Sequence, residues 1–204
     1  MTVEIRQLGL SDRREATAIA ALCYPHLDPE LRFQESDVDD HVRVFGEGAF
    51  AAVVDGVLVG FAVGWLMDFD LDDPGHRLED VMEPDQHDPE GDWYYGLDIA
   101  VHPECRGMGI GRSLYEARKD LVRTLGRRGI VAGGMIPGYR AVQDELTPFE
   151  YVAQVVTGER RDPTLSFQLS NGFAVHGLLP RYVDGTAGRG IATLLVWDAP
   201  GASG

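Results

Sequence analysis

Short runs of alternating apolar and polar residues recur along the chain, and this is the pattern of β-strands that bury one face. The clearest example in the first half is a pair of β-rich runs around Asp55-Gly56, which predicts an antiparallel hairpin. Similar runs, each bounded by turn residues, predict further strands. Together the predicted strands cover residues 3–7, 50–54, 57–66, 93–101, 130–135, 173–179 and 192–197.

Apolar residues at helical intervals predict helices between these strands. The first helix follows Asp12 and Glu15, which have the spacing of a capping box. The longest helix runs from Arg112 to Leu125 and is closed by Gly126 at the C′ position. Weaker helical patterns cover residues 38–45, 147–157 and 162–170. This mixture of strands and helices predicts an α+β protein.

The composition is that of an ordinary globular protein, with 44% hydrophobic and 25% charged residues among 204. No linker or repeat interrupts the chain, so we expect a single domain over residues 1–204. No apolar run of about 18 residues is present, and the N-terminus lacks the apolar segment of a signal peptide. We therefore expect no membrane partner and a cytoplasmic location.

The net charge of −15 opposes binding to nucleic acid and would attract a cationic amine, although solubility alone also explains it. Residues 68–92 hold eleven acids, one base and three prolines, and are interpreted as a solvated insertion. His76 and His87 lie among these acids in no metal-binding spacing, so no metal is expected. A further hypothesis is that the insertion lines the entrance for an amine acceptor.

The segment from Val101 to Gly111 carries three glycines at alternate positions directly before a helix. Glycine allows the backbone to approach a ligand closely, and the amides at a helix N-terminus attract a pyrophosphate. The loop lacks the Lys-Ser/Thr ending of a P-loop, and its spacing differs from that of a dinucleotide fold. A tight turn without a ligand is the remaining alternative.

The residues Val101-x-Pro103-x-x-Arg106-Gly107-x-Gly109-Ile110-Gly111 resemble the acetyl-CoA-binding motif of the GCN5-related N-acetyltransferases (GNAT). The order of predicted elements is also similar to that family from about residue 3 to residue 198. The resemblance implies the acyl-CoA N-acyltransferase fold, with α/β/α layers and a mixed, mostly antiparallel twisted sheet of about seven strands with a central splay. A homodimer is compatible with it.

Residues 132–139 and 162–173 carry a narrower resemblance, to the acetyltransferase domain that is fused to a carbon-nitrogen hydrolase in some bacterial proteins. The sequence ends at Gly204, so we expect no hydrolase activity from it.

The family reaction is direct attack of a neutral amine on the thioester of acetyl-CoA. In the predicted strand Trp93–Val101, residues 97, 99 and 101 share one face, whereas Asp98 and Ala100 share the other. Asp98 and Tyr95 are the candidate proton acceptors, although Asp98 could equally be a hydrogen-bonded structural acid. By resemblance, the co-substrate is bound by Ile99, Ala100, Val101, Arg106, Gly107, Met108, Gly109, Ile110, Gly111, Arg112 and Ser113.

Many family members place a tyrosine before the Gly-Phe pair, where it protonates the departing thiolate. Here alignment on Gly172-Phe173 puts Gln168 at that position. Either Tyr139, Tyr151 or Tyr182 substitutes for it, with Tyr139 as a catalytic candidate, or the thiolate leaves unaided. The predicted function is acetyl transfer to the primary amine of a small molecule. The alternative is a non-catalytic acyl-CoA-binding sensor or scaffold module.

Overall fold

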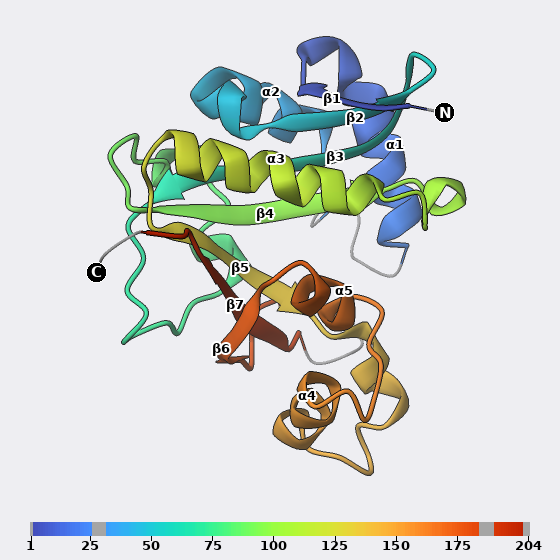
Figure 1. Cartoon of the computed structure of the whole chain (residues 1–204), viewed down its shortest axis with the longest axis vertical. Coiled ribbons are helices and arrows are strands. Elements are labelled where there is room, and N and C mark those ends of the chain that lie inside the picture. The colour runs from blue at the N-terminus through green and yellow to red at the C-terminus, as the bar shows by residue number, and fades with distance from the viewer. Residues whose placement is uncertain (1, 26–31, 184–189, 202–204) are drawn as a thin grey trace.

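A computed structural model describes residues 2–25, 32–183 and 190–201. Its centre is a seven-stranded sheet in the order β1-β2-β3-β4-β5-β7-β6 (Figure 1). β4 and β5 are parallel, and the other neighbouring strands are antiparallel. The strands are β1 (Val3–Gln7), β2 (Phe50–Val54), β3 (Val57–Met67), β4 (Trp93–Val101), β5 (Gly129–Met135), β6 (Ala174–Leu179) and β7 (Ala192–Asp198). The predicted fold class is confirmed.

Helices cover both faces of the sheet (Figure 1). The alternation of β2 sends Ala51 and Val53 into a cluster with α1 and α2, whereas Phe50 and Ala52 pack with Ile110 of α3 on the opposite face. The helices are α1 (Arg13–Cys23), α2 (Glu35–Phe45), α3 (Ile110–Thr124), α4 (Pro148–Val156) and α5 (Leu165–Ser170). The layers are therefore α/β/α.

The predicted splay lies between β4 and β5. These strands pair only from Trp93 to Tyr95, opposite Gly129 to Val131. β4 then continues to Val101 and β5 to Met135 without further pairing between them. Along its second half, the edge of β4 that faces β5 is therefore not paired with another described strand.

Two local predictions need correction. The carboxylate of Asp12 does not form a capping box with Glu15, because it accepts hydrogen bonds from Arg6 (2.6 and 2.7 Å) and from the Gly9 amide (2.8 Å). The long helix begins at Ile110, two residues before the predicted start, because the left-handed Gly109 already serves as its N-cap. Gly126 does close the helix with a positive φ of 66°.

The acidic insertion 68–92 is only partly solvated. It contains the short 3₁₀ turns Leu78–Asp80 and Pro84–Gln86. Val81 is 3% exposed, and its carbonyl accepts a hydrogen bond from Trp65 Nε1 (2.9 Å). The insertion is thus fixed against the sheet, which sequence composition alone did not indicate.

None of the described helices is long and apolar enough to span a membrane. The expectation of one domain over residues 1–204 stays a prediction.

Candidate active site

The glycine-rich loop leads from β4 into the N-terminus of α3. Counting from the start of α3, Ser113 is the first residue whose amide has a hydrogen-bond acceptor among the described residues. It donates to the Gly109 carbonyl (3.0 Å). The amides of Ile110, Gly111 and Arg112 precede this first helical bond and are therefore available to a ligand. Residues 106–109 are exposed around them. The loop fits a phosphate group, because free amides and the positive end of a 15-residue helix meet there.

The three glycines of the loop serve different purposes. Gly107 and Gly109 have φ values of 82° and 83°, a conformation that side chains disfavour, although a Cβ would meet nothing within 4 Å. Gly111 lies inside the helix, where a Cβ would come within 2.8 Å of Phe167 of α5. The backbone conformation of the loop and the packing of α5 over α3 therefore both depend on glycine.

The remaining predicted co-substrate residues lie around this loop. Arg106 is exposed and contacts the sulfur of Cys23, at the end of α1 (3.6 Å). Arg112 is exposed in the first turn of α3, and the Ser113 hydroxyl donates to the Gly109 carbonyl (3.3 Å). Ile99, Ala100 and Val101 form the end of β4 beyond the last residue paired with β5.

A β-bulge in β4 places Leu97 and Asp98 on the same side of the strand. Val63 of β3 stands opposite two residues, because Ala62 pairs with Ile99 and Gly64 pairs with Gly96. Leu97 and Asp98 consequently line the same pocket. The expected alternation, with Leu97 on the face opposite Asp98, is therefore wrong at this point.

A buried arginine, which the sequence reading overlooked, holds the bulge in place. Arg118 of α3 is 2% exposed and donates to the carbonyl of Val63 (2.5 Å) and to that of Asp98. Its guanidinium also lies over the Tyr94 ring, 5.5 Å from the centroid. The Arg118 guanidinium thus fixes a positive charge next to the backbone of Asp98.

The pocket beside Asp98 lies between β4, α2 and the acidic insertion. Its wall combines aromatic and aliphatic side chains with four carboxylates. The lining residues are Phe33, Asp37, Asp40, His41, Trp65, Leu78, Met82, Glu83, Pro84, Leu97 and Asp98. The insertion supplies four of these residues and therefore borders this pocket.

The carboxyl group of Asp98 is suited to accept a proton near neutral pH. Burial raises the pKa of Asp98 to about 6, and nearby Asp37 acts in the same direction. The Arg118 charge opposes this increase in pKa. Asp98 is therefore ionised at pH 7, yet its pKa is close enough for proton transfer.

His41 of α2 also lines this pocket. It is 3% exposed and stacks on Trp65, with ring centroids 4.1 Å apart. Burial, together with the Arg118 charge, lowers the pKa of His41 to about 3. Its Nδ1 atom has no hydrogen-bond partner in the described parts of the chain.

The predicted catalytic tyrosines do not line this pocket. The Tyr95 hydroxyl is hydrogen-bonded to His76 Nε2 (2.6 Å) and to the Tyr182 hydroxyl (3.1 Å). The Tyr139 hydroxyl donates to the Leu146 carbonyl (3.0 Å), and Tyr151 donates to Asp162 (2.8 Å). All the tyrosines named as substitutes for the missing acid are thus engaged in other hydrogen bonds.

Sequence reasoning did not name two further tyrosines, Tyr24 and Tyr115. Tyr24 donates to the Ile99 carbonyl of β4 (3.0 Å). Burial raises the pKa of Tyr24, and the charge of Asp98 adds to this increase. Tyr115 of α3 is 3% exposed and interacts with Gln168. Burial raises the pKa of Tyr115, whereas Arg118 and Gln168 lower it.

Gln168 occupies the position where the family has its tyrosine. Its side chain is 6% exposed and lies against Gly134 of β5, where a Cβ would be 2.6 Å from Oε1. That oxygen has no partner in the described part of the molecule. Gln168 and Tyr115 therefore connect α5, β5 and α3 next to the splay.

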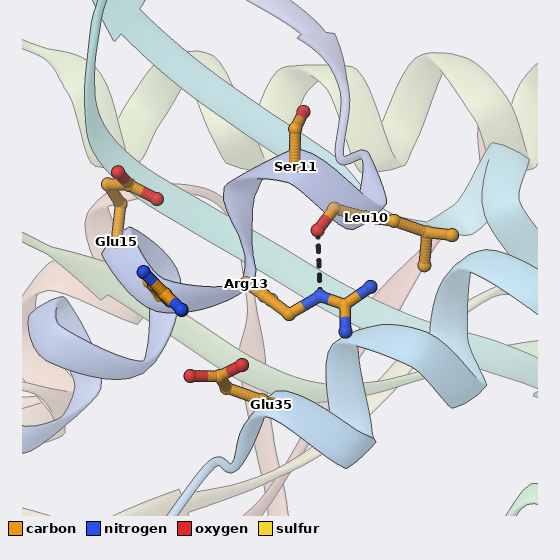
Figure 2. Close-up of a pocket in the computed structure, with 6 residues that line it drawn as sticks. Leu10, Ser11, Arg13, Glu15 and Glu35 are labelled. Carbon is orange, nitrogen blue, oxygen red and sulfur yellow. Dashed lines mark hydrogen bonds between the residues drawn. The ribbon is translucent and has the colours of Figure 1, made fainter.

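A larger hollow of ≈ 440 Å³ lies at the start of α1 and α2. Figure 2 shows Arg13 in it, with Nε donating to the Leu10 carbonyl (2.9 Å), and Glu15 and Glu35 nearby. No residue of β4 or of the glycine loop lines it. Arg13 and Cys23 are the two ends of an 11-residue helix, about 16 Å apart, and only the Cys23 end reaches the loop. This hollow is therefore not part of the candidate site.

Among the described residues, no group of three or more His, Cys, Asp or Glu side chains is placed to hold a metal ion.

The splayed sheet, the bulge on β4 and the glycine-rich loop before α3 define an acyl-CoA N-acyltransferase fold. The chain belongs to the GNAT acetyltransferase family, since the family model described as "Acetyltransferase (GNAT) family" matches residues 13–142. The predicted family is thereby confirmed.

Two relatives from Bacillus subtilis strain 168 match almost the whole chain. "Probable hydrolase YhcX" is 39% identical over 198 residues, which are 95% of this chain and 38% of YhcX. "Uncharacterized N-acetyltransferase YkwB" is 28% identical over 197 residues, which are 95% of this chain and 87% of YkwB. The chain thus spans well under half of YhcX, which agrees with the resemblance to a fused acetyltransferase domain.

Solved structures share the fold at low sequence identity. The loading GNATL domain of CurA from Lyngbya majuscula has a TM-score of 0.80, with 21% identity and 98% of both chains covered. The "GphF GNAT-like decarboxylase in complex with isobutyryl-CoA" has a TM-score of 0.79, with 21% identity, covering 96% of this chain and 99% of GphF. The "putative ACETYLTRANSFERASE" yncA from Salmonella typhimurium, "with its cofactor Acetyl-CoA", has a TM-score of 0.62, with 18% identity, covering 100% and 98%.

Proposed function

We propose that the protein transfers an acetyl group from acetyl-CoA to a primary amine of a small molecule by direct attack. The observation that carries the proposal is the placement of Asp98. This half-buried carboxylate lines a pocket beside β4, and the same strand leads into the glycine loop, where the amides of Ile110, Gly111 and Arg112 precede the first helical hydrogen bond. The acyl-CoA ligands named for GphF and yncA support coenzyme A as the occupant of the loop.

In this proposal the amides of the loop and of the first turn of α3 bind the pyrophosphate of the co-substrate. The extended pantetheine arm lies along β4 from Ile99 to Val101, beyond the pairing of β4 with β5. To bond the carbonyls of Ile99 and Val101 it displaces Tyr24 (3.0 Å) and Cys23 (3.3 Å), which donate to them in its absence. Acetyl-CoA supplies the thioester carbonyl that the amine attacks. Arg106, Arg112 and Ser113 surround the phosphate groups.

Asp98 accepts a proton from the ammonium group of the acceptor, which must be neutral to attack. An alkyl ammonium has a pKa near that of lysine, about 10, so it is protonated at pH 7 without a base. The ionised carboxylate of Asp98 borders the pocket and makes this transfer local. A carbon–nitrogen bond then forms as the carbon–sulfur bond breaks. The second amine proton is lost to solvent, and Asp98 afterwards releases its own proton to solvent.

Tyr115 provides a proton for the departing thiolate. It is the tyrosine next to Gln168, so its hydroxyl lies near the place where the family keeps its acid. Tyr95 and Tyr139, by contrast, are engaged in other hydrogen bonds. Tyr115 then regains its proton from solvent.

The test is turnover by the purified chain with acetyl-CoA and a panel of small primary amines. Release of free coenzyme A, with acetylated amine detected by mass spectrometry, supports the proposal. Tight binding of coenzyme A by calorimetry with no product from any amine contradicts it, and supports the non-catalytic sensor or scaffold instead.

A further inference from the structure

Two consecutive residues, Cys23 and Tyr24, form the α1 end and bond to groups that the proposed co-substrate needs. The Tyr24 hydroxyl donates to the Ile99 carbonyl (3.0 Å), and the Cys23 thiol donates to the Val101 carbonyl (3.3 Å). The Arg106 guanidinium donates to the Cys23 sulfur (3.6 Å). The α1 end thus engages two carbonyls of β4 and an arginine expected beside the pyrophosphate.

The two carbonyls have the spacing that an added strand would use. Ile99 and Val101 are two residues apart in β4, so their carbonyls lie on the same edge of the strand. An extended ligand that adds to a sheet bonds alternate residues of such an edge. The α1 end therefore makes hydrogen bonds at both positions where an extended arm along β4 would make its own.

The α1 end can leave β4 without movement of the whole helix. The body of α1 is anchored by Ala16, Ile19 and Ala20, each of which is at most 3% exposed. Cys23 is the last residue of the helix, and Tyr24 already has a non-helical backbone. Both side chains are only partly buried. Rotation of these two side chains would therefore release the carbonyls while the helix stays packed on the sheet.

The contacts are also weak enough for a ligand to displace. A neutral hydrogen bond within a protein changes an equilibrium by only about 2- to 10-fold, and a thiol is a weaker donor than a hydroxyl. In the free protein the same contacts satisfy carbonyls on a strand edge that is not paired with β5. The α1 end therefore protects this edge and can still give way.

We propose that the α1 end is an autoinhibitory contact, which holds the edge of β4 in the free protein and lowers its affinity for acetyl-CoA until the pantetheine arm displaces it. A nucleotide that lacks this arm binds at the glycine loop and leaves the Tyr24 hydrogen bond in place. This inference rests on the proposed function, because it concerns the path of the co-substrate through the same site.

Calorimetry with the Tyr24→Phe variant tests the contact. One ligand is coenzyme A, and the other is adenosine 3′-phosphate 5′-diphosphate, which has the same nucleotide and diphosphate without the arm. The Kd for coenzyme A should fall about 2- to 10-fold, because the variant has no hydroxyl to be displaced from the Ile99 carbonyl. The Kd for the nucleotide should stay the same.

Two results for coenzyme A would overturn the inference. An unchanged Kd would mean that the Ile99 carbonyl accepts from both donors at once, or that the arm does not use it. A higher Kd would mean that the Tyr24 hydroxyl stabilises the bound complex rather than the free protein.

Tyr139→Phe is the matched control, because the Tyr139 hydroxyl also donates to a backbone carbonyl at 3.0 Å, that of Leu146. It should leave the ratio of the two Kd values unchanged. An equal change of this ratio in both variants would contradict a specific role of the α1 end. Cys23→Ala removes the second donor and should also lower the Kd for coenzyme A, whereas a higher Kd in this variant contradicts the inference.

Binding kinetics show in which state the contact acts. Because it stabilises the free protein, Tyr24→Phe should raise the association rate constant of coenzyme A about 2- to 10-fold, with little change in dissociation. A change confined to the dissociation rate constant would overturn the inference.

The failure of this inference is distinguishable from the failure of the proposed function. Tighter binding of coenzyme A by Tyr24→Phe, with no amine acetylated by the wild-type protein, would support the autoinhibitory contact while the transfer reaction fails. Acetylation of an amine with equal Kd values for the wild type and Tyr24→Phe would overturn the contact and leave the proposed function intact. A wild-type protein that binds neither ligand would contradict both.

Discussion

Replacing Asp98 by asparagine would remove the proposed base and also a charge that the folded protein tolerates poorly. The pKa of Asp98 is raised from 3.8 to about 6, chiefly by burial. At 1.36 kcal/mol per pKa unit, this difference corresponds to about 3 kcal/mol. The folded state binds the proton more tightly than the unfolded state, so the carboxylate lowers the free energy of unfolding as the pH rises from about 4 to about 6.

The Asp98→Asn variant lacks this loss of stability. Its free energy of unfolding relative to wild type should therefore increase with pH, by about 1.4 kcal/mol between pH 5 and pH 8. Urea unfolding at both pH values measures the difference, and any constant effect of the amide cancels. In the same variant kcat should fall about 10²- to 10⁴-fold, and the limb of the kcat/KM profile near pH 6 should disappear.

Asp85→Asn is the control for this experiment, because Asp85 is exposed and away from the pocket. It should change neither the pH dependence of stability nor kcat. If the difference in free energy of unfolding between Asp98→Asn and wild type stays constant from pH 5 to pH 8, the raised pKa of Asp98 is refuted. A variant that keeps wild-type kcat would refute its role as the base.

The other predictions concern the loop, the proposed acid and the buried arginine. Gly109→Val should weaken coenzyme A binding at least about tenfold, as measured by calorimetry. Gly158→Val is the control and should not weaken it, because Gly158 has a similar φ of 81° and a Cβ there would also meet nothing within 4 Å. Equal affinities of the two variants would contradict the loop assignment. Tyr115→Phe should lower kcat about tenfold or more with the fold preserved by circular dichroism, and an unchanged kcat would exclude it as the acid. Arg118→Met should destabilise the protein by about 2–4 kcal/mol in urea, because two carbonyls lose their donor. The same variant should move the acid limb of the kcat/KM profile above pH 6, since the Arg118 charge lowers the pKa of Asp98; a limb that stays in place contradicts that coupling.

Much of the fold could be predicted because its signals are local. The strand Trp93–Val101 has the predicted bounds, and the hairpin turn at Asp55-Gly56 has positive φ at both residues. The glycine loop could likewise be identified, since glycine spacing before a helical pattern is read from neighbouring residues. These features need no knowledge of distant contacts.

The bulge and the pocket could not be predicted in this way. The offset at Val63 arises from the pairing of β3 with β4, so the alternation read within β4 alone misplaced Leu97 relative to Asp98. The pocket combines α2, two strands and the insertion, and composition gave no sign that Val81 is buried.

One missed residue did leave a signal in the sequence. Arg118 lies four residues after Leu114 and four before Val122, on the buried face of α3. A basic residue at such a core position indicates a cation that binds buried carbonyls or acids. His41 leaves a comparable signal, because it lies three residues after Val38 and four before Phe45 on the buried face of α2.

Mass spectrometry with isotopically labelled acetyl-CoA tests the central claim most directly. The purified chain is incubated with the labelled co-substrate and the panel of small primary amines, and both the amines and the protein are analysed. We predict that the label appears as an amide on an amine, in amounts equal to the coenzyme A released, and that the Asp98→Asn variant forms little of this amide. Label attached to the protein would contradict direct attack, and coenzyme A binding with no labelled amide would contradict acetyl transfer to a small amine.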